Sequence, residues 1–277
     1  MRTPASQLPA DSPVRTPATD PMPTYPFSRA LITGASAGIG EEFAKILGDA
    51  GVPCVVVARR GDRLAELAAR YTAFEVLEAD LQSAAGVSAV AARIASDDNP
   101  IDLVVNNAGF GSSGEFHEVD VERATGQVDL NIRALVELTH ASVLAMRQRG
   151  GGWILNVSSV ASFMASPKMA VYAATKSFVT SFSEAVHEEN RKHNVRVSAL
   201  CPGFVSTEFQ AVSGGADRIS RTPRFLWLKS NNVAKAGLDG VVKNRAIVVP
   251  GWQYSSMPLI SKVIPRSILR RIAGNLL

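Results

Sequence analysis

Tyr172 and Lys176 have the residue types and the spacing needed for proton transfer. They stand four residues apart in the run Val-Tyr-Ala-Ala-Thr-Lys, so on a helix their side chains lie on one face. A phenol ionises with a pKa of ~10, and a neighbouring ammonium is expected to lower that pKa toward working pH. The same spacing also suits a solvated lysine one turn after a packed tyrosine. The pair is therefore a candidate general acid/base whose assignment depends on other motifs.

The run Thr-Gly-Ala-Ser-Ala-Gly-Ile-Gly at 33–40 is a second chemical signal. An apolar, strand-like run ends just before it, and residues 41–47 follow with the apolar spacing of a helix. A strand, a glycine turn and a helix start suit a bound pyrophosphate, because glycines allow close backbone approach and the helix N-terminus offers free N–H groups. A tight loop without a ligand would use glycines as well.

Strand-like and helical patterns alternate from residue 28 onward, which predicts parallel βαβ units. We expect strands at 28–33, 52–58, 74–78, 101–105, 152–157, 195–200 and 246–249, and helices at 38–50, 62–71, 84–97, 120–148, 172–192 and 231–244. The predicted fold is one α/β domain over 27–251, a Rossmann-type doubly wound parallel sheet of seven strands in the order 3-2-1-4-5-6-7, with helices on both faces. Ligands of such sheets bind at the carboxyl ends of the strands, where the motifs fall.

Several motifs stand in the order of one known family. They are Thr33, Gly34, Gly38, Ile39 and Gly40, then Asn106, Asn107, Ala108 and Gly109, then Asn131, Ser159, Tyr172 and Lys176, and last Pro202, Gly203 and Thr207. With these residues the chain resembles the short-chain dehydrogenase/reductase family over about residues 28 to 250. No catalytic position departs from the family pattern, and the chain leaves that pattern at its two ends.

The resemblance implies a role for each catalytic residue. Tyr172 would give a proton to a carbonyl oxygen as hydride reaches the carbon, and Ser159 would hydrogen-bond the same oxygen. Ser159 rather than its neighbour Ser158 stands thirteen residues before the tyrosine, as in the family. Lys176 would hold the nicotinamide ribose, and Asn131 would position a water in a relay to that lysine. Asn131 also suits a capping or packing asparagine.

Arg59 and Arg60 end the second predicted strand, where an acidic residue would bind the ribose hydroxyls of NAD. A basic pair there favours the 2′-phosphate of NADP, although it also suits a solvated helix start. We expect Arg59 to make the phosphate contact, with Arg60 and Ser36 as further candidates. The residues expected to bind the cofactor are Gly34, Ser36, Gly38, Ile39, Gly40, Arg59, Arg60, Asp80, Leu81, Asn107, Ala108, Gly109, Tyr172, Lys176, Pro202, Gly203, Val205 and Thr207.

The two ends and one internal segment differ in composition from the rest. Residues 1–26 hold seven of the fifteen prolines and are expected to be a disordered tail, and translation from Met22 would remove most of it. Residues 252–277 carry basic but no acidic residues, with apolar residues at helical spacing, which predicts a basic amphipathic extension. Such an extension packs on the protein, on a second subunit or on an anionic membrane, and we favour packing. The segment 204–228 is long enough for a lid over an apolar substrate.

Several classes of protein are disfavoured. The four histidines form no ligand cluster, so we expect no metal, and the basic net charge of +4 equals the contribution of the C-terminal extension, so we expect no nucleic acid partner. No apolar run reaches the ~18 residues of a membrane span. Cys54 and Cys201 fall on strands that the predicted order places far apart, so a disulfide is not expected and a cytoplasmic location fits.

The sequence thus predicts an NADP-dependent oxidoreductase that interconverts a ketone or aldehyde and an alcohol, on an apolar substrate, as a homo-oligomer. One alternative is an NAD-linked oxidation of a secondary alcohol. Another is a cofactor-binding scaffold recruited through its C-terminal tail, which the complete set of Asn131, Ser159, Tyr172 and Lys176 argues against.

Overall fold

The computed structural model describes residues 24–209, 222–265 and 267–271. Most of the expected N-terminal tail, the centre of the expected lid, Ile272 and Leu276 lie outside these ranges. Among the described residues, no helix is long and apolar enough to cross a membrane.

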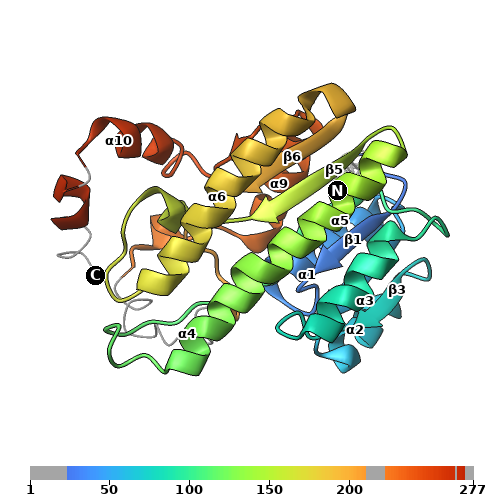
Figure 1. Ribbon diagram of the computed structural model, residues 1–277, viewed down its shortest axis with the longest axis horizontal. Helices are drawn as coiled ribbons and strands as arrows, with labels where there is room; N and C mark the ends of the chain where they lie inside the picture. Colours follow the sequence, from blue (N-terminus) through green and yellow to red (C-terminus); the bar gives the residue numbers. More distant parts are fainter. Residues whose placement is uncertain (1–23, 210–221, 266, 272–277) are drawn as a thin grey trace, which may run out of the picture.

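A parallel sheet in the order β3-β2-β1-β4-β5-β6-β7 forms the centre of the molecule and confirms the predicted fold (Figure 1). Its strands are β1 (Ala30–Thr33), β2 (Cys54–Ala58), β3 (Glu75–Glu78), β4 (Leu103–Asn106), β5 (Gly152–Val157), β6 (Val195–Leu200) and β7 (Ile247–Val248). The inner strands are apolar because helices cover both of their faces. At one edge, β3 has the sequence Glu-Val-Leu-Glu, and none of its four residues is fully buried.

Helices cover both faces of the sheet (Figure 1). They are α1 (Gly38–Asp49), α2 (Gly61–Ala68), α3 (Ala84–Ala95), α4 (Val121–Val128), α5 (Leu135–Gln148), α6 (Ala170–Asn190), α9 (Ser230–Val242) and α10 (Met257–Val263). On one face, Phe43 of α1 and Leu238 of α9 belong to one buried cluster. On the other, Ile94 of α3 and Leu138 of α5 belong to a second cluster. The sheet is thereby held rigid between two apolar layers, and its strand ends stay in fixed register.

The helix predicted over 120–148 is interrupted by a π-helical turn over Asp129–Ala134. Asn131 lies within this turn, and its side chain makes hydrogen bonds away from its own helix. π-Turns of this kind are rare and often mark functional sites. Apolar periodicity continued across the turn, which is why the sequence pattern alone did not show it.

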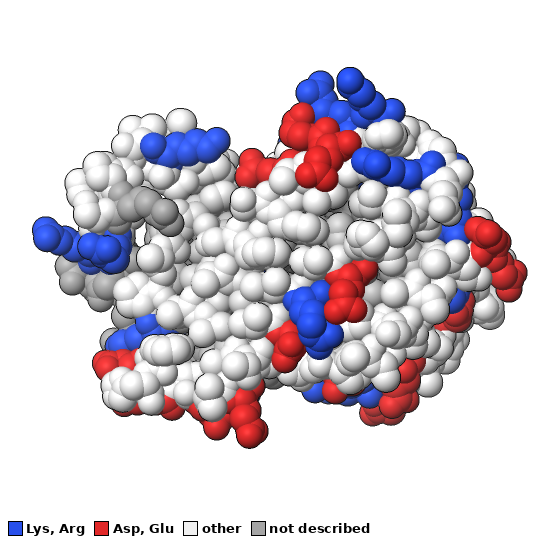
Figure 2. Space-filling model, in the orientation of Figure 1, with Lys and Arg blue, Asp and Glu red and all other residues white. Residues whose placement is uncertain are grey.

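The C-terminal segment stands out from the body of the protein (Figure 1). It forms α10 and a further helical stretch at 267–271, with Pro265 between them. Leu269 is buried, whereas Leu259, Val263 and Ile268 are exposed, so only part of the expected packing on the protein occurs. In Figure 2, blue Lys and Arg atoms mark this lobe, in keeping with the lack of acidic residues in 252–277.

Candidate active site

One cavity of about 880 Å³ contains nearly all of the predicted site residues. It lies at the carboxyl ends of the strands, where the sequence placed the site. Gly34, Ser36, Gly38, Ile39, Arg59, Arg60, Asp80, Leu81, Asn107, Ala108, Gly109, Ser159, Tyr172, Lys176, Pro202, Gly203, Val205 and Thr207 line it. Gly40 and Asn131 do not line it, and both pack directly behind its wall.

The glycine turn requires glycine for two different reasons. Gly34 and Gly38 have φ angles of +67° and +61°, which side-chain-bearing residues rarely adopt. Gly40 instead lies so close to the carbonyl oxygen of Gly34 that a Cβ there would collide with it. The turn thus brings its backbone, and the N-terminus of α1, to the cavity surface, as close binding of a pyrophosphate requires.

Thr33 and Asn107 join the glycine turn to the end of β4. The Thr33 hydroxyl accepts hydrogen bonds from the backbone N–H groups of Asn107 and Ala108, both at 3.0 Å. Asn107 Nδ2 in turn donates to the carbonyl oxygen of Thr33 at 3.0 Å. Asn106 does not face the cavity, since its Nδ2 donates to Asn156 and Thr139 in the core. These hydrogen bonds hold the ends of β1 and β4 together beneath the glycine turn.

The two arginines after β2 point to different partners. Arg60 donates from Nε and Nη2 to the Ser36 hydroxyl, at 3.1 and 3.0 Å. Arg59 instead donates from Nη1 to Gln82 Oε1 at 3.3 Å. An arginine and a serine hydroxyl that face one another at the nucleotide end form a donor set suited to a phosphate. Arg60, rather than Arg59, is thus the arginine that lies against Ser36.

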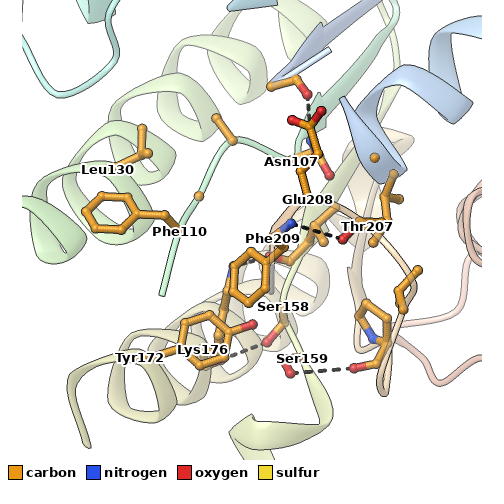
Figure 3. A pocket seen from close by; sticks show the side chains of 18 of the residues that line it. Asn107, Phe110, Leu130, Ser158, Ser159, Tyr172, Lys176, Thr207, Glu208 and Phe209 are labelled. Carbon is orange, nitrogen blue, oxygen red and sulfur yellow. Dashed lines mark hydrogen bonds between the residues drawn. The ribbon is translucent and has the colours of Figure 1, made fainter. Parts of the chain in front are cut away.

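Ser159, Tyr172 and Lys176, the predicted catalytic residues, come from two elements, the end of β5 and the helix α6 (Figure 3). Ser159 follows β5, and its hydroxyl accepts from Ala161 N at 3.1 Å. The Ser158 hydroxyl faces away and donates to the Lys176 carbonyl oxygen at 2.8 Å, so it ties the strand end to α6. The structure thus gives the two adjacent serines different roles and leaves Ser159 beside the phenol.

Burial shifts the pKa of both titratable catalytic groups. Burial raises the pKa of Tyr172 to about 12, and a hydrogen bond with Ser159 opposes this rise. The sequence led us to expect a lowered pKa for Tyr172, and in the structure burial raises it instead. Burial lowers the pKa of Lys176 to about 8, because the ammonium is removed from water. Lys176 Nζ donates to the Val157 carbonyl oxygen at 2.8 Å and lies 5.8 Å from the centroid of the Tyr172 ring.

Asn131 reaches the site through hydrogen bonds to the backbone of the loop that follows β4. Its Oδ1 accepts from Phe110 N at 3.1 Å, and its Nδ2 donates to Phe110 O at 3.0 Å and to Thr175 Oγ1 at 3.1 Å. A Cβ placed on Gly109 would lie 2.9 Å from Asn131 Oδ1 and 3.5 Å from Lys176 Nζ. The asparagine thus orders the loop against which the lysine lies.

A large part of the cavity wall is apolar, which sequence motifs did not reveal. Phe110, Leu130, Met164, Met169, Phe204, Phe209, Tyr254 and Met257 line it. Phe209 lies beside the catalytic phenol, with ring centroids 5.5 Å apart (Figure 3). Tyr254 reaches back from the C-terminal segment, donating from its hydroxyl to Leu226 O at 2.7 Å and accepting from Phe204 N. The predicted lid supplies Phe204 and Phe209, whereas no sequence signal pointed to Tyr254 or Met257.

Comparison with known proteins shows the family. The pattern of the short chain dehydrogenase family matches residues 28–216, and the chain belongs to the short-chain dehydrogenase/reductase family. It is therefore an oxidoreductase, of a family that typically uses a nicotinamide cofactor.

Solved structures resemble it closely. A short-chain dehydrogenase from Sphingobium yanoikuyae in complex with NADPH shares 32% identity, covering 82% of this chain and 89% of its own, with a TM-score of 0.76. A bulky-bulky ketone specific alcohol dehydrogenase from Comamonas testosteroni shares 29%, covering 83% and 88%, with a TM-score of 0.73. A 3-ketoacyl-(acyl-carrier-protein) reductase from Brucella melitensis complexed with NADH shares 27%, covering 80% and 95%, with a TM-score of 0.73.

Proposed function

We propose that this enzyme is an NADP(H)-dependent carbonyl reductase that interconverts bulky apolar ketones and their secondary alcohols. The observation that supports this most is the shared cavity: Ser159, Tyr172 and Lys176 open into the same space as the glycine turn and the Arg60–Ser36 pair. The cofactor would lie with its pyrophosphate at the glycine turn and its 2′-phosphate at Arg60, and it would supply the hydride. Similar proteins bind NADPH or NADH, and the basic residues after β2 favour the former.

The protein's own side chains transfer the proton. As negative charge grows on the substrate oxygen, Tyr172 Oη gives it a proton, and the Ser159 hydroxyl donates a hydrogen bond to the same oxygen. Burial raises the pKa of Tyr172, and the hydrogen bond with Ser159 opposes that rise and so favours release of the proton. We expect the Lys176 ammonium, whose Nζ lies 5.8 Å from the ring centroid, to favour release as well. With a pKa of about 8, Lys176 is near the point where it gains and loses a proton at working pH. A chain from Tyr172 through Lys176 to water near Gly109 and Asn131 would replace the proton.

The substrate class follows from the walls beside the phenol. Phe110, Met164, Met169 and Phe209 line the same cavity as Tyr172, and the Phe209 ring lies 5.5 Å from the phenol ring. An apolar substrate would lose contact with water on entering, which contributes ~25 cal/mol for each Å² buried. A ketone with large groups on both sides of the carbonyl fits such a space better than a small polar aldehyde.

The test is a screen of NADPH oxidation over ketones and aldehydes of increasing apolar size, with β-ketoacyl thioesters included. We expect kcat/KM to rise with apolar area on both sides of the carbonyl, by ~10-fold for each additional 1.4 kcal/mol of burial. The variant Phe209→Ala should reduce this dependence, whereas Phe116→Ala, an exposed phenylalanine outside the cavity, should not. A preference for small polar carbonyls would contradict the proposed substrate class.

We further propose that the enzyme is a cytoplasmic homo-oligomer without a nucleic acid partner. Both cysteines are buried and free, which suits a reducing compartment. Exposed apolar side chains on α10 and the preceding loop, namely Trp252, Leu259 and Val263, favour contact with a second copy over isolation in water.

The double substitution Leu259→Ser and Val263→Ser is expected to lower the sedimenting mass, because both side chains are exposed on the single chain and would be covered by the second copy. Analytical ultracentrifugation measures the mass, and Phe116→Ser is the matched control, since Phe116 is 70% exposed at another site. An unchanged mass, together with binding to anionic vesicles that the double variant abolishes, would instead assign the tail to a membrane surface.

A further inference from the structure

Glu208 is an acidic residue in the nucleotide half of the cavity. It follows Thr207 in the loop after β6 and reaches α2 and the residue before it. Arg60 Nη1 donates to its Oε2 at 3.0 Å, and Arg63 Nη1 donates to its Oε1 at 2.7 Å. In Figure 3 the residue belongs to the same loop as Thr207 and Phe209. The carboxylate therefore joins the loop that borders the catalytic phenol to the helix that follows β2.

Arg60 is shared between two partners at this place. Its Nε and Nη2 face the Ser36 hydroxyl, and its Nη1 faces Glu208. The hydrogen bonds from Arg63 and Arg60 lower the pKa of Glu208, so the carboxylate is charged at neutral pH. A phosphate that approached Arg60 and Ser36 would meet this second anion on the same guanidinium.

We propose that Glu208 is a specificity-determining residue, an internal anion that competes with the 2′-phosphate of NADP(H) for Arg60. The inference rests on the proposed use of NADP(H). When the phosphate binds Arg60, Glu208 loses one of its two arginines and retains Arg63. The enzyme's preference for NADP(H) over NAD(H) is therefore smaller than it would be without the Glu208 carboxylate.

We expect Glu208 to change the affinity for a 2′-phosphate ligand only modestly, because its ion pairs are partly exposed. The side chains of Arg60 and Glu208 are 43% and 48% accessible, so solvent screens their interaction. Two unit charges about 4 Å apart in a water-like dielectric change an affinity by about fivefold. The effect should appear only with ligands that carry the 2′-phosphate.

The test measures binding of 2′,5′-ADP and 5′-AMP by calorimetry to the full-length enzyme. Glu208→Gln keeps the size of the side chain and removes its charge. We expect Glu208→Gln to lower the Kd for 2′,5′-ADP by about fivefold and to change the Kd for 5′-AMP by less than about twofold. An unchanged or weaker affinity of Glu208→Gln for 2′,5′-ADP would overturn the proposal.

Two further variants separate this inference from the cofactor assignment. Glu66→Gln removes a charge from the exposed face of α2 and should leave both affinities unchanged, which controls for net charge. Arg60→Gln should weaken the binding of 2′,5′-ADP. In the double variant, Glu208→Gln should no longer raise the affinity for 2′,5′-ADP. If Arg60→Gln weakens 2′,5′-ADP but Glu208→Gln does nothing, only the role of Glu208 fails. If Arg60→Gln has no effect, the phosphate is read elsewhere and the role of Glu208 fails with that of Arg60. If the wild-type enzyme binds 2′,5′-ADP no more tightly than 5′-AMP, the proposed use of NADP(H) fails.

Discussion

Replacing Tyr172 with Phe is expected to lower kcat by ~10²-fold or more while leaving the Kd for NADPH within a few fold. The substitution removes only the hydroxyl that donates the proton, and positioned proton transfer usually contributes at least that factor. The ring of Phe keeps the contact with Phe209, whose centroid lies 5.5 Å away, so the wall of the cavity is retained. Steady-state kinetics and fluorescence titration of NADPH measure the two quantities separately.

Two controls make the Tyr172 result specific. Ser158→Ala alters a hydroxyl that bonds the backbone of Lys176, and should reduce stability more than chemistry. Lys176→Ala should impair both turnover and cofactor binding, since the lysine is expected to hold the nicotinamide ribose as well as to tune the phenol. If the Tyr172→Phe enzyme kept more than about a tenth of the wild-type kcat, the tyrosine would not be the proton donor.

Replacing Arg60 with Asp is expected to reverse the cofactor preference from NADPH toward NADH. The variant loses a charge-assisted contact worth on the order of 1.5–3 kcal/mol, about 10- to 150-fold in affinity, and adds a carboxylate that repels the 2′-phosphate. The same carboxylate can accept hydrogen bonds from the ribose hydroxyls of NADH. Paired measurements of kcat/KM with the two cofactors give the change in preference.

Arg59→Asp is the matched control for Arg60→Asp, because it places the same charge one residue earlier. Arg59 donates to Gln82 rather than to Ser36, so we expect a smaller change in preference. A larger effect at Arg59 than at Arg60 would show that the phosphate lies against α3 and not against the glycine turn.

The sequence predicted the sheet well because burial on both faces leaves a plain signal. Apolar runs at the inner strands alternate with helical patterns, which indicates a parallel sheet, and the strand order comes from the Rossmann-type fold. The meeting of Ser159, Tyr172 and Lys176 in one cavity was predictable for a similar reason, since they stand at characteristic spacings on a strand end and one helix.

Other features depend on contacts between distant residues and were not predicted. Tyr254 packs over Gly203 and accepts a hydrogen bond from the Phe204 N–H, fifty positions earlier in the chain. Which of two adjacent arginines turns toward Ser36 depends on the loop around it. The raised pKa of Tyr172 likewise comes from burial by the whole fold, whereas spacing showed only the neighbouring lysine.

The proposal of a catalytic carbonyl reductase, as opposed to a cofactor-binding scaffold, is tested most directly by product stoichiometry. Enzyme, NADPH and a bulky apolar ketone are incubated together, and the alcohol formed is measured by mass spectrometry against the NADPH consumed. We expect one alcohol for each NADPH oxidised with the wild-type enzyme, and neither product nor oxidation above background with Tyr172→Phe. NADPH binding without any alcohol across the ketone panel, or equal turnover in the two proteins, would contradict the assignment.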